Sequence, residues 1–232
     1  MKQCVIFDYG GTLVYSIEGK VIQEVVRSLG LTTQELDSEK LLKRYYEVWY
    51  STSIGLPRGQ RLTPETIGRS MYTAALDVLG NAELAHVVAS AYVASEGKSG
   101  TRRLYPDVIP TLKELRKAGI QMGIVSENLK LSRDLRTELA HLCKGEYFDS
   151  VVTSEEVSLH KPDPKLFIAG ARSLGVDPGD CLYVGDSLEL DIKGARKAGM
   201  DAALICRGEP SKLEATPPSL SSLVDILELL RK

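Results

Sequence analysis

The sequence predicts an α/β protein, in which a parallel β-sheet is covered by helices and interrupted by one inserted helical block. Two observations support this fold class. Short apolar segments alternate with segments of helical periodicity over most of the chain, as in sheets whose crossovers are helices. The alternation stops between residues 16 and 96, where only helical patterns follow the first expected strand. We therefore expect a discontinuous core of residues 1–15 and 97–232, and a helical domain of residues 16–96.

Five short apolar segments are expected to be strands buried on both faces of the sheet. They are Cys4–Phe7, Ile120–Val125, Ser150–Val152, Cys181–Gly185 and Ala202–Cys206. Helical periodicity marks four further segments of the core. They are Pro106–Gly119, Asp163–Gly175, Leu188–Gly199 and Ser222–Lys232. Three of these helices end at a glycine, and one begins with the Asp-Pro pair at residues 163–164, which favours a helix start.

The helical block contains four expected helices, at residues 21–30, 38–50, 64–80 and 83–95. Glycines and prolines predict a loop over Ser53–Thr66, between the second and third of them. Four aromatic residues recur at helical spacing in the second helix, and they are either the core of the block or a platform for a substrate. They are Tyr45, Tyr46, Trp49 and Tyr50.

Composition argues against several classes of partner. The 232 residues include 29 Lys and Arg against 31 Asp and Glu, a net charge of −2, which gives no electrostatic reason to bind nucleic acid or an anionic membrane. No apolar run approaches the ~20 residues that span a bilayer, and the first residues do not resemble a signal peptide. The four cysteines lack C-x-x-C spacing, and the three histidines make no zinc pattern. We expect a cytoplasmic protein with reduced thiols.

Polar side chains follow the expected strands at the edge where ligands bind in open parallel α/β sheets. Asp8 follows the first strand, Ser126 the second and Asp186 the fourth, while Lys161 lies in the loop after the third. Asp191 comes five residues after Asp186. Each residue alone has a simpler explanation, as a helix cap, an exposed acid or a solvated lysine. Their common position at strand ends favours one shared site.

The residue types of this site have a common chemical use. Mg²⁺ prefers carboxylates, water and phosphate oxygens as ligands, so Asp8 and Asp186 can share one ion. Lys161 and the Ser126 hydroxyl can bind the remaining phosphoryl oxygens as charge redistributes. Asp8 would then attack phosphorus and form an aspartyl-phosphate.

The order and surroundings of these residues resemble the haloacid dehalogenase superfamily of phosphatases and related hydrolases, from the first strand to about residue 206. VIFDYGGTL resembles motif I, GIVSEN motif II, HKPDP motif III and VGDSLELD motif IV. The resemblance implies a Rossmann-like core, with the helical block as a C1-type cap. It also implies roles for individual residues. These are Asp8 as nucleophile, Thr12 as the motif I threonine, Ser126 and Lys161 as phosphate ligands, Asn128 near the phosphate, and Asp8, the Gly10 carbonyl, Asp186 and Asp191 around the metal.

Gly10 departs from the family's pattern. The phosphatases usually read D-x-D in motif I, and the second Asp is their general acid and base. Gly10 keeps the carbonyl that the family uses on the metal but cannot donate or accept a side-chain proton. General acid–base catalysis contributes about 10²–10⁴-fold to rates. The glycine implies slow turnover, a leaving group of low pKa, a substitute group from the cap, or lost activity.

Magnesium-dependent hydrolysis of a small phosphorylated metabolite is therefore the first expectation, and the oligomeric state stays open. Cleavage of C–P or C–halogen bonds is an alternative, as is a phosphate-binding or regulatory protein without activity. Phosphonate-cleaving relatives need a cap lysine, and Lys20, Lys40 and Lys43 stand in no recognised setting; metal-free dehalogenases lack the Gly-Asp of motif IV. Arg58 and Arg61, in the loop of the helical block, either bind a second anionic group of the substrate or lie in solvent.

Overall fold

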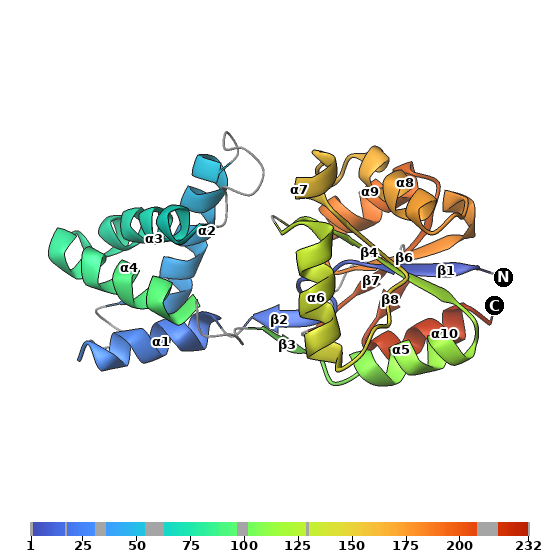
Figure 1. Ribbon diagram of the computed structural model, residues 1–232, viewed down its shortest axis with the longest axis horizontal. Helices are drawn as coiled ribbons and strands as arrows, with labels where there is room; N and C mark the ends of the chain where they lie inside the picture. The colour runs from blue at the N-terminus through green and yellow to red at the C-terminus, as the bar shows by residue number, and fades with distance from the viewer. Residues whose placement is uncertain are drawn as a thin grey trace. The chain divides into compact units, whose positions relative to one another are not determined.

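The computed structural model of the protein describes residues 2–16, 18–30, 36–53, 63–96, 102–128, 130–207 and 218–231. The chain divides into two compact units. Met1–Tyr15 and Leu104–Lys232 form the first, called here the α/β unit, and Ser16–Arg103 form the second, called the helical unit. Figure 1 shows the sheet and its helices in the first unit and four helices in the second. The expected fold class, a parallel α/β core with an inserted helical domain, is confirmed.

The α/β unit contains a six-stranded sheet in the order β5-β4-β1-β6-β7-β8. Every pairing within it is parallel. The strands are β1 (Cys4–Phe7), β4 (Gln121–Ser126), β5 (Ser150–Thr153), β6 (Cys181–Gly185), β7 (Asp201–Ile205) and β8 (Ser219–Leu220). The first five agree with the expected strands to within one residue at either end. The short β8 was not expected, because its two residues carry no pattern of their own.

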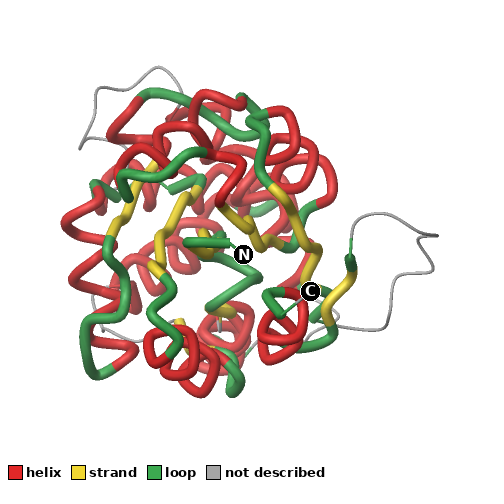
Figure 2. Tube along the Cα trace, turned by 90° about the vertical axis from the view of Figure 1, so that its right-hand side faces the viewer, coloured by secondary structure: helices red, strands yellow, loops and turns green. Residues whose placement is uncertain are grey.

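Helices cover both faces of this sheet, as Figure 2 shows from the end of the α/β unit. The side chains of β1 alternate between two apolar clusters. Val5 and Phe7 pack with α5 (Val108–Lys117), α6 (Ser132–Cys143), η3 (Leu223–Asp225) and α10 (Ile226–Leu229). Cys4 and Ile6 pack with α8 (Pro164–Ser173) and α9 (Lys193–Lys197). Three short turns complete the unit: α7 (Ser154–Val157), η1 (Pro178–Asp180) and η2 (Leu188–Ile192).

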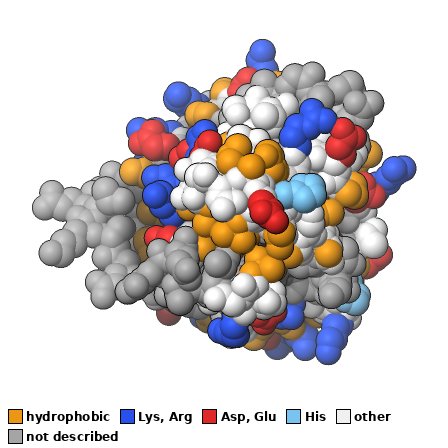
Figure 3. Space-filling model, turned by 90° about the vertical axis from the view of Figure 1, so that its left-hand side faces the viewer, with side chains coloured by type: hydrophobic (Ala, Val, Ile, Leu, Met, Phe, Trp, Pro, Cys, Tyr) orange, Lys and Arg blue, Asp and Glu red, His pale blue; other side chains and the backbone are white. Residues whose placement is uncertain are grey.

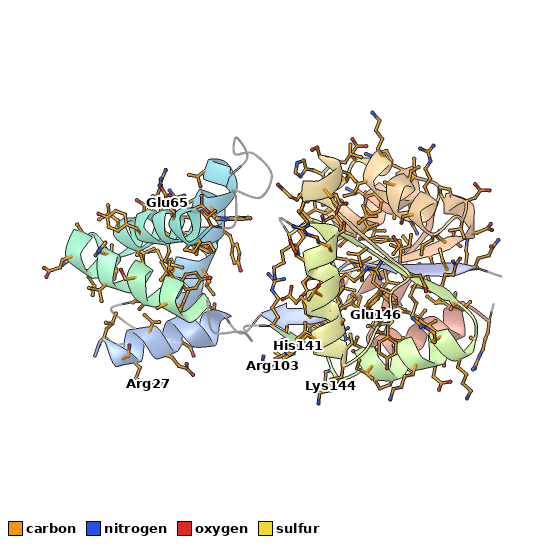
Figure 4. All side chains as sticks on the ribbon, in the orientation of Figure 1. Arg27, Glu65, Arg103, His141, Lys144 and Glu146 are labelled. Atoms are coloured by element: carbon orange, nitrogen blue, oxygen red, sulfur yellow. The ribbon has the colours of Figure 1, made fainter. Side chains whose placement is uncertain are left out.

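The helical unit has its own apolar core. Its helices are α1 (Glu18–Ser28), α2 (Ser38–Ser53), α3 (Pro64–Leu79) and α4 (Ala82–Glu96). Tyr45 is buried in this core, with Trp49 packed against it, whereas Tyr46 is exposed. Two of the four aromatic residues thus belong to the core, and the side chain of Tyr50 lies outside the described structure. Figure 4 labels Arg27 in the last turn of α1 and Glu65 in the first turn of α3. At these positions a positive and a negative charge, respectively, interact favourably with the helix dipole.

A two-stranded ribbon lies where the chain passes between the units. It pairs β2 (Val14–Ser16) with β3 (Arg102–Leu104). Residues 54–62, the middle of the expected loop, lie outside the described residues, and Arg58 and Arg61 are among them. None of the described helices has the length and apolarity needed to cross a bilayer. In the view of Figure 3, the basic and acidic side chains that are drawn in colour are interspersed.

Candidate active site at the carboxyl edge of the sheet

Strand register brings the expected site residues to one edge of the sheet. Phe7 of β1 pairs with Ile124 of β4 on one side and with Val184 of β6 on the other. Asp8 therefore lies one residue beyond the end of β1, while Ser126 and Asp186 lie two residues beyond the paired positions of the flanking strands. Parallel strands all end at the same edge, so these side chains converge.

Lys161 is the cation at the centre of the site. Its Nζ atom lies 2.5 Å from Asp8 Oδ1 and 2.6 Å from Asp191 Oδ1. All three side chains are buried, whereas Asp186 is exposed. Carboxylate oxygens of Asp8, Asp186 and Asp191 all lie within 4.8 Å of one another. The site thus holds three carboxylate side chains and one buried lysine.

Burial and mutual repulsion act on these acids. Burial raises the pKa of Asp8 to about 7, against the lowering effect of Lys161, and the charge of Asp191 adds to the rise. The pKa of Asp186 is also raised, first by partial desolvation among the surrounding groups, although the residue is exposed overall, and then by the charge of Asp191. Burial alone would lower the pKa of Lys161, but the charges of Asp8 and Asp191 outweigh it and raise that pKa. The lysine stays protonated, and the acid cluster carries more negative charge than one lysine neutralises.

Two glycines allow the acids to approach the backbone this closely. A Cβ atom on Gly11 would lie 2.1 Å from Asp186 Oδ2, and Gly11 has a φ of +73°. A Cβ atom on Gly185 would lie 2.4 Å from Asp191 Cγ. At Gly10, in contrast, a Cβ atom would meet nothing within 4 Å. The site therefore requires glycine at positions 11 and 185 but has room for a side chain at position 10.

A π-helical turn orients Asp191. The backbone N–H groups of Asp191 and Ile192 both donate to the Ser187 carbonyl, at 3.0 and 3.1 Å, which widens the first turn of the expected helix. Asp191 Oδ2 accepts a hydrogen bond of 3.0 Å from the Ser187 N–H. The Tyr183 hydroxyl lies 3.1 Å from Asp191 Oδ1 and 3.1 Å from the Val125 carbonyl. Asp191 is held from three directions, by Ser187, Tyr183 and Lys161.

Glu127 fixes the loop that carries Lys161. Its Oε2 accepts a hydrogen bond of 2.9 Å from the Lys161 N–H, and its Oε1 lies 2.6 Å from His160 Nδ1. Glu127, His160 and Tyr183 were not among the residues expected at the site. A local signal existed for Glu127 alone, since it directly follows Ser126 at a strand end.

The remaining expected residues lie around the acids. Ser126 is buried at the end of β4. Asn128 is half-buried, and its Oδ1 accepts from the Lys130 N–H at 2.9 Å, so its side chain also stabilises its own loop. Thr12 is fully buried, and its hydroxyl has no hydrogen-bond partner among the described residues. Within the described structure Thr12 thus makes no side-chain hydrogen bond to Asp8, and Arg58 lies outside the described residues.

The donor set fits a hard divalent cation. Three carboxylates within 4.8 Å, of which two are buried, form an oxygen-rich cluster with excess negative charge. Mg²⁺ is bound in proteins by a few carboxylates and keeps several waters. The described His and Cys residues form no cluster with these acids, so the ligand chemistry does not favour zinc.

Comparison with known proteins agrees with this arrangement. The sequence profile of the haloacid dehalogenase-like hydrolases matches residues 2–199. A protein of Methanopyrus kandleri named glyceraldehyde 3-phosphate phosphatase is 35% identical over 221 residues, which cover 92% of this chain and 88% of the relative. The crystal structure of a HAD phosphatase from Thermococcus onnurineus has a TM-score of 0.63 and 28% identity, covering 99% of this chain and 98% of its own. A 2-haloacid dehalogenase from Pseudomonas syringae has a TM-score of 0.64 and covers 100% of this chain and 99% of its own, but at 24% identity it supports the fold alone.

Proposed function

The chain belongs to the haloacid dehalogenase-like hydrolases, and on this premise we propose that it is a magnesium-dependent phosphatase that acts on a small phosphorylated metabolite through an aspartyl-phosphate. One observation carries the proposal: Asp8, Asp186 and Asp191 place carboxylate oxygens within 4.8 Å of one another, and Lys161 bonds two of these acids. Such a site suits a cation and a phosphoryl group together.

Asp8 would act as the nucleophile. Its carboxylate oxygen attacks phosphorus, a new P–O bond forms, and the bond from phosphorus to the ester oxygen of the leaving alcohol breaks. Asp8, Asp186, Asp191 and the Gly10 carbonyl would hold Mg²⁺, which when bound neutralises the charges of the phosphoryl group and of Asp8. Lys161 is already bonded to Asp8 Oδ1, so its charge lies where the phosphoryl oxygens would arrive. The Ser126 hydroxyl would donate a hydrogen bond to one of those oxygens.

Water would then attack the aspartyl-phosphate, release inorganic phosphate and restore the Asp8 carboxylate. Two proton transfers are needed, one to the leaving alkoxide and one from the attacking water. Gly10 supplies neither, and the described part of the α/β unit offers no other acid at that position, where space is open. The site therefore favours substrates whose leaving group departs without protonation, or that bring their own acid.

The name of the relative from Methanopyrus kandleri supports a small phosphate monoester as substrate. Glyceraldehyde 3-phosphate is the first compound to test. The expected partner is a small phosphorylated molecule, with neither nucleic acid nor a membrane required.

The test is phosphate release from a panel of phosphorylated metabolites and p-nitrophenyl phosphate, with Mg²⁺ and with EDTA. Asp8→Asn should lower kcat by about 10⁴-fold or more, because an amide is not a nucleophile. Asp77→Asn is the control, since Asp77 pairs with Arg44 at 2.8 Å on the surface of the helical unit. Activity of Asp8→Asn above about a tenth of wild type would contradict the assignment. Tight phosphate binding by wild type without turnover of any ester would instead favour a binding or regulatory protein.

A further inference from the structure

Arg207 joins three segments that are distant in sequence, just beyond the last residue of β7. One Nη atom donates a hydrogen bond of 2.7 Å to Asp107 Oδ2, and the other donates to the carbonyl of Thr12. The guanidinium also stacks on the ring of Tyr105, 3.9 Å from its centroid. Arg207 thus contacts the loop after β1 and the segment between β3 and α5.

The loop after β1 is the segment that carries the site. Hydrogen bonds close it into a turn, since the N–H groups of Leu13 and Val14 both donate to the Tyr9 carbonyl, at 3.0 and 3.1 Å. This turn begins directly after Asp8, contains Gly10 and presses Gly11 against the Asp186 carboxylate. Thr12 is its central residue, and its carbonyl is held by Arg207.

The other side of Arg207 is firmly anchored. Asp107 Oδ2 also accepts from the Leu223 N–H at 2.8 Å and the Ser222 hydroxyl at 2.9 Å. The Tyr105 N–H donates to the Leu13 carbonyl at 3.0 Å, next to the residue that Arg207 bonds. Arg207 therefore connects the turn to α5 and to the start of η3, both packed in the core of the α/β unit.

Stability alone does not explain this group. Three of its buried polar atoms have no hydrogen-bond partner within the described structure: Thr12 Oγ1, Asp107 Oδ1 and Arg207 Nε. Unpaired buried polar atoms destabilise a fold, and a buried arginine pair can often be replaced by apolar residues without loss. A planar guanidinium, however, can hold two acceptors and stack on a ring at the same time, which no other side chain does.

We propose that Arg207 is a positioning residue for the Tyr9–Val14 turn, and that it holds the Asp8 and Gly10 groups in the geometry that binds the metal and the phosphoryl group. Its place in catalysis rests on the proposed function, but its effect on the turn does not. Arg207 acts through the backbone of Thr12.

The test compares Arg207→Lys with a matched variant, Arg136→Lys. Arg136 also donates to two backbone carbonyls, those of Phe148 at 2.7 Å and Asp149 at 3.2 Å, but it lies on α6 and its partners precede β5. In both variants lysine keeps the positive charge but lacks the planar guanidinium that donates to two acceptors at once. Hydrogen exchange of the metal-free protein measures the turn directly, and calorimetry measures the dissociation constant for Mg²⁺.

Arg207→Lys should speed amide exchange at Leu13 and Val14 about 10-fold or more, and should weaken Mg²⁺ binding about 10-fold, the usual effect of removing a group that orients metal ligands. Arg136→Lys should change neither. If the protein hydrolyses phosphate esters, Arg207→Lys should lower kcat more than it raises KM, because the turn carries the reacting groups. Should Arg207→Lys fail to fold, Asp107→Asn gives a milder test: its amide oxygen can still accept the three hydrogen bonds, but the negative charge that pairs with Arg207 is lost.

Unchanged exchange at Leu13 and Val14 in a folded Arg207→Lys protein would overturn the proposal. Equal effects in the two variants would also overturn it, because the role would then be general stability. A wild type without Mg²⁺ binding or phosphatase activity would refute the proposed function, while the exchange measurement would still decide whether Arg207 orders the turn.

Discussion

The two units treat polar side chains differently. In the α/β unit, four charged residues are buried: Asp8, Glu155, Lys161 and Asp191. In the described part of the helical unit, the buried residues are apolar except for Ser70. No charged residue in the described part of the helical unit is buried, and Arg44 and Asp77 form an ion pair at its surface. The described part of the helical unit thus has an ordinary apolar core, whereas the α/β unit holds charged side chains that are shielded from water.

This difference locates the function and its energetic cost. Buried charges are unfavourable unless they are paired, and in the α/β unit two buried acids, Asp8 and Asp191, share one lysine. The raised pKa of Asp8 expresses the same cost, because the protein disfavours its charged form. We therefore expect substitutions in the α/β site to separate activity from stability, and equivalent substitutions in the helical unit to leave activity unchanged.

After the loss of activity expected for Asp8→Asn, the largest effect on rates is expected at Gly10. Without an acid at this position, the rate at which the leaving group departs from phosphorus depends on its own pKa. p-Nitrophenyl phosphate should therefore react much faster than alkyl phosphates. Gly10→Asp should raise rates on alkyl phosphates by up to about 10²–10⁴-fold and flatten the series. The new side chain has room, since a Cβ atom there meets nothing within 4 Å. Rates over esters of graded leaving-group pKa, for both proteins, provide the measurement.

A flat series for wild type would contradict this reading of Gly10. The proton would then come from elsewhere, such as a group of the helical unit or a bound water. Gly11→Ala is a useful contrast, because its Cβ atom would lie 2.1 Å from Asp186 Oδ2 and should disrupt the site.

Asp8→Asn should stabilise the metal-free protein while removing its activity. The pKa of Asp8 is 3.8 in the unfolded chain and about 7 in the folded protein. Between about pH 4 and 7 the folded protein therefore keeps a proton on Asp8 that the unfolded chain has lost, and its stability falls as the pH rises. The difference corresponds to about 4 kcal/mol at most above pH 7. Urea unfolding in EDTA should therefore show a gain for Asp8→Asn that is largest above pH 7 and absent below pH 4.

The helical unit supplies the contrast to this gain. Asp77→Asn breaks an exposed pair, so it should change the free energy of unfolding far less than Asp8→Asn does. A loss of stability in Asp8→Asn at pH 8 would mean that Lys161 stabilises Asp8 more than burial destabilises it.

Asp186 and Asp191 should differ in what their removal does. Asp186 is exposed and free to bind a cation, whereas Asp191 is buried and held by Lys161, Tyr183 and Ser187. Asp186→Ala should weaken Mg²⁺ binding by about 100-fold with little loss of stability. Asp191→Ala should weaken it less but lower the free energy of unfolding by about 3–5 kcal/mol, because a buried pair loses one partner. Calorimetry and urea unfolding of both variants decide between these roles, and equal Mg²⁺ effects would contradict the distinction.

Sequence reasoning found what depends on local pattern and strand order. The five main strands and the acids at their ends follow from apolar segments and from the rule that parallel strands end at one edge. Tyr183, Glu127 and Arg207 were not found. In the sequence, Tyr183 cannot be told apart from the apolar residues of the buried strand β6. Arg207 cannot be told apart from any polar residue that follows a strand, here β7. Their partners lie 58 and 195 residues away, at Val125 and Thr12, so only the folded chain shows the contacts.

The smallest effect is expected at Tyr183, where the two units can be compared directly. The Tyr183 hydroxyl has one proton and two neighbouring acceptors, the Val125 carbonyl and Asp191 Oδ1, both at 3.1 Å. Tyr183→Phe keeps the packing against Phe167 and removes only the hydroxyl. Loss of one such hydrogen bond should cost about 1 kcal/mol of stability and, because Asp191 is less firmly held, weaken Mg²⁺ binding by less than about 10-fold.

The matched variant is Ser70→Ala, which removes the buried hydroxyl of the helical unit, 3.3 Å from Thr52 Oγ1. It should cost a similar or smaller amount of stability and leave Mg²⁺ binding unchanged. If Tyr183→Phe also left Mg²⁺ binding unchanged, Asp191 would be oriented by Lys161 and the Ser187 N–H alone, and the Tyr183 hydroxyl would belong to the packing of the sheet rather than to its site. If Ser70→Ala altered Mg²⁺ binding, the separation of function into one unit would be wrong, since a hydroxyl in the core of α2 and α3 would then act on an ion held at the end of β1.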